Sequence, residues 1–67
     1  MIELKVYNRL IVMKDGMYFV KMQGKKPEWG YSPYMAWHDK SRLYAQKVAD
    51  KFSGVVRSFN PVTGRVW

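Results

Sequence analysis

The chain has no cysteine among its 67 residues and few acidic side chains. The lack of cysteine excludes a disulfide and a thiolate zinc site, and it fits a reducing compartment such as the cytoplasm. No apolar run approaches the ~20 residues that span a bilayer. Residues 1–13, with scattered charges and no small-residue cleavage site, do not read as a signal peptide. We therefore expect a cytoplasmic protein that does not enter membranes.

Groups that carry catalysis are also scarce. His38 is the single histidine, and it stands beside Asp39 at an expected helix start. General acid–base catalysis usually needs a second titratable group held close by, whereas the five acidic residues are scattered. Isolated carboxylates do not build a calcium or magnesium cage, and there is no glycine-rich phosphate loop followed by Lys-Ser or Lys-Thr. We expect no enzyme activity, no metal and no cofactor.

Positive charge and aromatic rings are abundant. Twelve Lys and Arg against five Asp and Glu give a formal charge of +7, and there are three Trp, five Tyr and three Phe. A cationic surface attracts polyanions, and exposed rings give bases a stacking surface. We expect one domain, residues 1–67. Its core is thin, since a chain of this length buries only about 60% of its unfolded surface, and homo-oligomerisation would offset that.

The first half of the chain predicts a hairpin. Residues 4–13 and 17–23 are rich in β-branched, aromatic and other apolar residues. Asp15-Gly16 between them is typical of a type I′ turn, which pairs Lys14 with Met17. One face of this hairpin is more continuously apolar, and we expect a helix to cover it; it carries Ile11, Met13, Tyr18 and Val20. The other, mixed face would lie open, with Leu10, Val12 and Phe19 between Lys14 and Lys21.

Residues 24–39 are the irregular part of the sequence. Two Pro, two Gly and Lys25-Lys26 argue against a helix there. Because a long structureless loop is uncommon in a compact domain, we expect a short strand at 34–37 and a loop at 24–33.

The second half predicts a helix and two strands. Asp39 or Ser41 is a suitable N-cap, and Gly54 is suited to the left-handed position that ends a helix. The buried stripe of this helix is expected to be Tyr44, Ala45, Val48, Ala49 and Phe52. Strands at 55–59 and 65–67 would flank a turn at 60–64. The predicted fold is α+β: a small antiparallel sheet, β-β-(β)-α-β-β, with one helix packed on one face.

Three groups of residues are candidates for contacting an anionic partner. Lysines 40, 47 and 51 fall within about 40° of one another on a helix, although such a row is also typical of a solvated flank. The irregular segment offers Lys25, Lys26, Trp29 and Tyr31, whose rings could instead fold back over the core. The mixed sheet face offers Lys14, Phe19 and Lys21, unless another segment or a second copy covers it. Two arginines complete the candidate set: Arg57 and Arg65.

The segment 36–39, the spacing of Ala45, Val48 and Ala49, and Gly54-Val55-Val56 form a pattern of core and cap positions. With the preceding hairpin, this pattern resembles short phage and prophage open reading frames of the β-hairpin–helix–strand kind over roughly residues 17–59. The resemblance implies a small viral accessory protein that acts inside a bacterial host cell and binds nucleic acid or inhibits a host or defence protein. It brings no catalytic residues with it.

Two functions follow as hypotheses. The first is a non-catalytic protein that binds nucleic acid, single strands included, by phosphate contacts to Lys and Arg and by ring stacking. The second is an inhibitor or modulator that docks on an acidic surface of a host or defence protein through Trp29, Tyr31 or Trp67, with a cationic rim.

Overall fold

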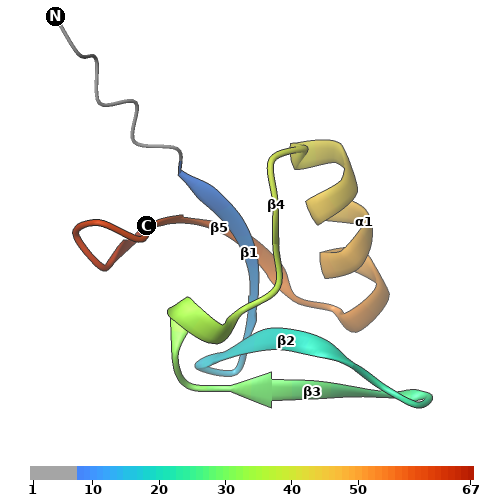
Figure 1. Cartoon of the computed structure of the whole chain (residues 1–67). Coiled ribbons are helices and arrows are strands. Elements are labelled where there is room, and N and C mark those ends of the chain that lie inside the picture. Colours follow the sequence, from blue (N-terminus) through green and yellow to red (C-terminus); the bar gives the residue numbers. More distant parts are fainter. Residues whose placement is uncertain (1–7) are drawn as a thin grey trace, which may run out of the picture.

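The computed structural model describes residues 8–67 and shows a curled antiparallel sheet with one α-helix packed against it (Figure 1). The elements in chain order are β1 (Arg9–Lys14), β2 (Met17–Gln23), β3 (Lys26–Gly30), the 3₁₀ helix η1 (Pro33–Met35), β4 (His38–Asp39), α1 (Arg42–Phe52), β5 (Val55–Asn60) and β6 (Arg65–Val66). The strand order is β3-β2-β1-β5-β6, and β4 pairs with β1. The predicted α+β class is confirmed.

The β1–β2 hairpin forms at the predicted turn. Asp15 and Gly16 both adopt positive φ, 52° and 77°, and Lys14 pairs with Met17. The register extends only one pair further, because Leu10 then pairs with Asp39 of β4 instead of with β2. Strand β2 therefore turns away from β1, which curls the sheet, as Figure 1 shows. The first part of the predicted strand at 4–13 lies outside the described residues.

The predictions for residues 24–37 are wrong in detail. The expected loop contains β3, which returns along β2 after a turn in which Gly24 adopts a φ of 65°. The expected strand at 34–37 does not form; residues 33–35 form η1, whose first residue is Pro33, a residue favoured at a helix start. The short strand follows it as β4, and the Trp37 N–H donates to the Phe19 carbonyl at 2.8 Å.

Local chemistry sets both ends of α1. The Ser41 hydroxyl accepts from the Tyr44 N–H at 3.3 Å, as expected of an N-cap. The left-handed residue at the other end is Ser53, with a φ of 58°, and not Gly54 as predicted. Gly54 is required for a different reason: a Cβ there would meet the Met13 carbonyl oxygen at 2.9 Å. The helix end is thus held tightly against β1.

The prediction of which sheet face α1 covers is also wrong. Val12 and Phe19 are buried in one cluster with Ala49 of α1. The opposite face is buried too, in a second cluster of Ile11, Ala36 and Phe59 with Tyr18 and Val66 packed against it. The segment after η1 and strand β6 supply that second cover. Both faces are apolar because both are covered, so alternation along the strands could not show which one the helix takes.

The C-terminal region follows the sequence pattern. The Asn60 side-chain oxygen accepts from the N–H groups of Val62 and Thr63 at 2.9 and 3.3 Å, which orders the predicted turn. Beyond it, β6 pairs with β5, and Ser58 and Trp67 exchange two backbone hydrogen bonds. No helix in residues 8–67 has the length and apolar character that crossing a membrane requires.

Candidate functional site

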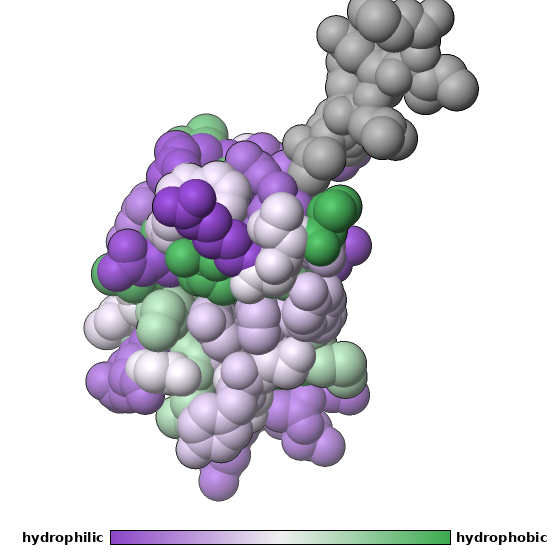
Figure 2. Space-filling view, turned by 90° about the vertical axis from the view of Figure 1, so that its left-hand side faces the viewer, coloured by the Kyte–Doolittle hydropathy of each residue, from purple (hydrophilic) through white to green (hydrophobic). Residues whose placement is uncertain are grey.

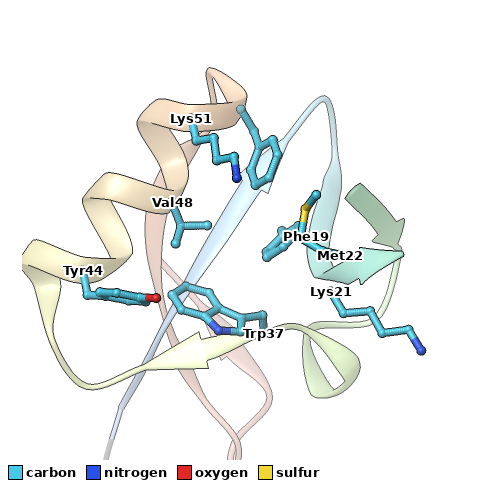
Figure 3. Close-up of a pocket in the computed structure, with 8 residues that line it drawn as sticks. Phe19, Lys21, Met22, Trp37, Tyr44, Val48 and Lys51 are labelled. Carbon is cyan, nitrogen blue, oxygen red and sulfur yellow. The ribbon is translucent and has the colours of Figure 1, made fainter. Parts of the chain in front are cut away.

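A hollow of about 300 Å³ lies between α1 and β2. Figure 3 shows its lining side chains converging from the helix, from β2 and from the segment that leads into β4. The residues that line it are Phe19, Lys21, Met22, Trp37, Tyr44, Val48, Lys51 and Phe52. We call this the α1–β2 hollow. Its lining combines rings, aliphatic groups and lysines.

The helix supplies one wall through regular spacing. Tyr44, Val48 and Lys51 stand at i, i+4 and i+7, so they share one face of α1. At about 100° per residue, Lys51 falls only about 20° from Tyr44 around the helix axis. The edge of the apolar stripe therefore meets the edge of the basic flank at the hollow.

A bulge in β2 supplies the opposite wall. Phe19 pairs with Trp29 and Met22 pairs with Pro27, with a register shift between Phe19 and Lys21. Trp29 and Pro27 are two residues apart on β3 and so point to the same face. Phe19 and Met22 therefore share the helix-facing side, although they are three positions apart. The extra residue in the bulge brings the flexible Met22 side chain to the hollow.

The rings of the hollow support one another. The Phe19 centroid lies 4.9 Å from that of Phe52 and 6.1 Å from that of Trp37, and Trp37 lies 5.9 Å from Tyr44. Trp29 packs behind them, 5.9 Å from Phe52 with nearly perpendicular planes. Phe19 is only 5% exposed whereas Tyr44 is 55% exposed. The floor of the hollow is thus fixed by core packing, and Tyr44 presents a ring to solvent at its rim.

The charge at the hollow is positive. The Lys51 Nζ lies 5.6 Å from the centroid of the Phe52 ring, and Figure 3 shows its amine extending over the hollow. The Lys21 side chain starts at the edge of the hollow and extends away from it (Figure 3). None of the lining residues in this described part of the chain is acidic. A ligand with a planar group and an anionic group matches this arrangement.

Two rings of the predicted site, Phe19 and Trp29, belong to the core packing of the protein. Phe19 was expected on an open sheet face, but α1 and the surrounding rings bury it, so a base cannot stack on it directly. Trp29 lies in β3 and is half-buried against Phe19 and Phe52, which makes it a support of the core. Tyr31 is 82% exposed just beyond β3, away from the α1–β2 hollow.

The predicted cations are spread over several places. Lys47 and Lys51 are exposed on α1, but Lys40 precedes the helix, so the expected helical row holds for two of its three members. The exposed Lys25 and Lys26 lie at the β2–β3 turn. Lys14 and Arg57 border another hollow beside the Asp15-Gly16 turn, and the Arg65 guanidinium lies 5.7 Å from the Trp67 ring. Of all the predicted cations, Lys21 and Lys51 line the α1–β2 hollow.

Sequence reasoning did not place five of the lining residues at this site: Met22, Trp37, Tyr44, Val48 and Phe52. The assignment of Phe52 to the buried stripe of the helix is confirmed, since it packs on the Val12–Phe19 cluster, as Trp37 does. The prediction that Tyr44 belongs to the buried stripe of the helix is wrong, since Tyr44 is 55% exposed. The available signal was the helical wheel, on which Tyr44 stands at the margin of that stripe, about 20° from Lys51. No local sequence pattern predicts the bulge in β2 that brings the Met22 side chain to the hollow.

Another side of the molecule has a different character. Figure 2 shows the side that carries the C-terminal turn and η1, with pale, near-neutral side chains over its centre and lower part, purple ones above and around them, and scattered green ones. That side offers no broad aliphatic patch. Comparisons with protein-family models, with curated proteins and with solved structures found no match.

Proposed function

We propose that this chain is a non-catalytic protein that binds nucleic acid, with the α1–β2 hollow and the adjoining basic flank of α1 as the contact surface. The observation that carries the proposal is the position of Lys51, an ammonium group above a ring-lined hollow without acidic neighbours in its lining. The formal charge of +7 supports it at longer range, since such a field draws polyanions toward the protein.

Lysines and aromatic rings would make different contacts with a nucleic acid strand. Lysine is a mobile point charge that contacts phosphate oxygens and positions a strand without reading its sequence. Aromatic rings stack on bases of any identity, because every base has a π-face. The combination supports binding that depends on salt and depends little on sequence.

The biological setting that we propose is the one that the sequence pattern implies. The chain would act as a phage accessory protein in the cytoplasm of a bacterial host, where single-stranded nucleic acid is produced during replication and transcription.

A second candidate function is docking on an acidic surface of a host or defence protein. Tyr31 and Met35 favour it, because they are 82% and 69% exposed and both border a small hollow on the β2–β3 side. Exposed tyrosine and methionine are enriched among residues that anchor protein interfaces. This surface is separate from the α1–β2 hollow, so the two functions are tested by different substitutions.

The test of nucleic-acid binding is a salt titration. Fluorescence anisotropy of a labelled oligothymidylate would give the affinity at several salt concentrations, starting at about 50 mM. We expect the logarithm of the affinity to fall linearly with the logarithm of the salt concentration, by about 0.7 for each phosphate contacted. No binding at the lowest salt would overturn the proposal.

Matched variants locate the surface. Lys51→Gln removes a charge at the hollow, whereas Arg65→Gln removes one beside Trp67. We expect Lys51→Gln to weaken binding more than Arg65→Gln does. Equal losses would mean that the charge acts only through the overall field. In the protein-docking alternative, Tyr31→Ala would abolish capture of the host partner and Lys51→Gln would have a small effect.

A further inference from the structure

Building on the proposed function, we infer that the α1–β2 hollow is a pocket for one unpaired nucleobase, and that the protein therefore selects single strands over duplexes. The base would enter beside the Tyr44 ring and rest on the wall of Phe52 and Val48. The phosphate next to it would meet the Lys51 ammonium group. The inference makes the hollow, and not the charge alone, responsible for recognition.

The size of the hollow fits one planar ring system. Its volume of about 300 Å³ stands at the lower end of the range for small-molecule sites, about 300–1,000 Å³. A recess of this volume suits a single planar ring better than a peptide helix, which is about 10–12 Å across with its side chains. A base within a duplex is also stacked on both faces and paired along one edge, so it cannot reach the floor unless it leaves the stack.

The walls are organised before a ligand arrives. Phe19 holds Phe52 at 4.9 Å and Trp37 at 6.1 Å between centroids, and Phe19 itself is buried. A base that packs against such a wall adds ring contacts without requiring the core to rearrange, which lowers the entropic cost of binding. Met22 is the adaptable member, because an unbranched thioether side chain adjusts to rings of different outline.

The charges stand on the correct side for phosphates that flank the base. Lys47 precedes Lys51 by four residues, about one helical turn, and both are exposed. On the helical wheel Lys51 lies about 20° beyond Tyr44, and Lys47 lies about 40° beyond Lys51 in the same direction. The basic flank therefore continues outward from the rim of the hollow. A strand that follows this flank would place consecutive phosphates along two lysines while one base turns inward.

The deciding experiment compares two oligomers of equal length and charge. One is oligothymidylate, and the other is the same sugar–phosphate backbone made entirely of abasic sites. Because stacking of one base contributes about 5- to 150-fold in affinity, we expect the abasic oligomer to bind at least about fivefold more weakly to the full chain. The salt slopes of the two oligomers should be the same, since both contact the same lysines.

Two variants locate the base. Val48→Phe fills the hollow from its own wall, and Leu43→Phe adds the same ring at a position on α1 that is 72% exposed. We expect Val48→Phe to bind the two oligomers equally and Leu43→Phe to keep the preference for oligothymidylate. Tyr44→Ala is the second route to the same loss if Val48→Phe does not fold, because Tyr44 is half outside the core and its removal leaves no internal cavity.

The outcomes separate this inference from the function on which it rests. Equal affinity of the unmodified protein for both oligomers would overturn the base pocket and leave nucleic-acid binding intact. A preference for bases that survives both Val48→Phe and Tyr44→Ala would place the base on another ring, and it would overturn the inference as well. If neither oligomer binds at low salt, the proposed function itself is wrong.

Discussion

The end of α1 gives a sharp test of the fold, because two neighbouring residues there have opposite requirements. Ser53 adopts a φ of 58°, a left-handed conformation that raises the energy of a residue with a Cβ by about 1–2 kcal/mol. Replacing it with glycine removes this strain, while the added freedom of the unfolded chain opposes folding by about 0.4–1 kcal/mol. We expect Ser53→Gly to stabilise the protein by about 0.5–1 kcal/mol.

Gly54→Ala should act in the opposite direction. The new Cβ would lie 2.9 Å from the Met13 carbonyl oxygen and 3.0 Å from the Val12 Cγ1 atom. The carbonyl belongs to β1, the central strand, and cannot shift without disturbing its pairing with β5. Crowding of this kind destabilises proteins by about 1–3 kcal/mol.

Thermal unfolding followed by far-ultraviolet circular dichroism measures both effects. For a chain of this size, 1 kcal/mol changes Tm by about 4–8 °C. We therefore expect a rise of about 2–8 °C for Ser53→Gly and a fall of at least about 4 °C for Gly54→Ala. Ser53→Ala is the control and should give little rise, since alanine keeps the Cβ that causes the strain. A fall in Tm for Ser53→Gly would refute the described helix end, because glycine destabilises a position inside a helix.

Three further measurements test the core, the turn and the charges. Phe19→Ala should destabilise the fold by about 3–5 kcal/mol, as deletion of a buried ring does, which denaturant unfolding would measure; a loss below about 1 kcal/mol would contradict its burial. Asn60→Ala removes an acceptor for two backbone N–H groups and should lower stability by about 1 kcal/mol, whereas the exposed Val62→Ala nearby should be neutral. Lys51→Gln should reduce the salt slope of oligonucleotide binding by about 0.7, and an unchanged slope would remove Lys51 from the phosphate contacts.

Local chemistry explains which parts of the fold could be predicted from the sequence. Asp15-Gly16, Ser41 and Asn60 act within a few residues of themselves, so their sequence neighbours carry the full signal for the hairpin, the helix start and the C-terminal turn. The failures depend on contacts between distant segments. Residues 26–30 form a strand only because β2 offers them a partner, and Gly54 is required by the closeness of β1 rather than by its own φ.

The candidate site was predictable only in part for the same reason. The sequence places Phe52 in the buried stripe of the helix and Lys51 on its basic flank. It does not show that α1 lies over Phe19, since both sheet faces are apolar. Because the prediction placed the helix on the other face, it treated Phe19 as an exposed ring. The hollow that forms above Phe19 was therefore not predicted.

The pairing of β1 with β5 has a consequence for the time at which this fold can form during synthesis. Ile11 pairs with Arg57, and even the pair that is nearest in the chain joins Met13 to Val55. At about 5–20 residues per second, a ribosome would take roughly 2–10 s to add the residues between them. During that interval the edge of β1 that β5 later covers has no partner from its own chain, and an unpaired strand edge is open to pairing with other chains.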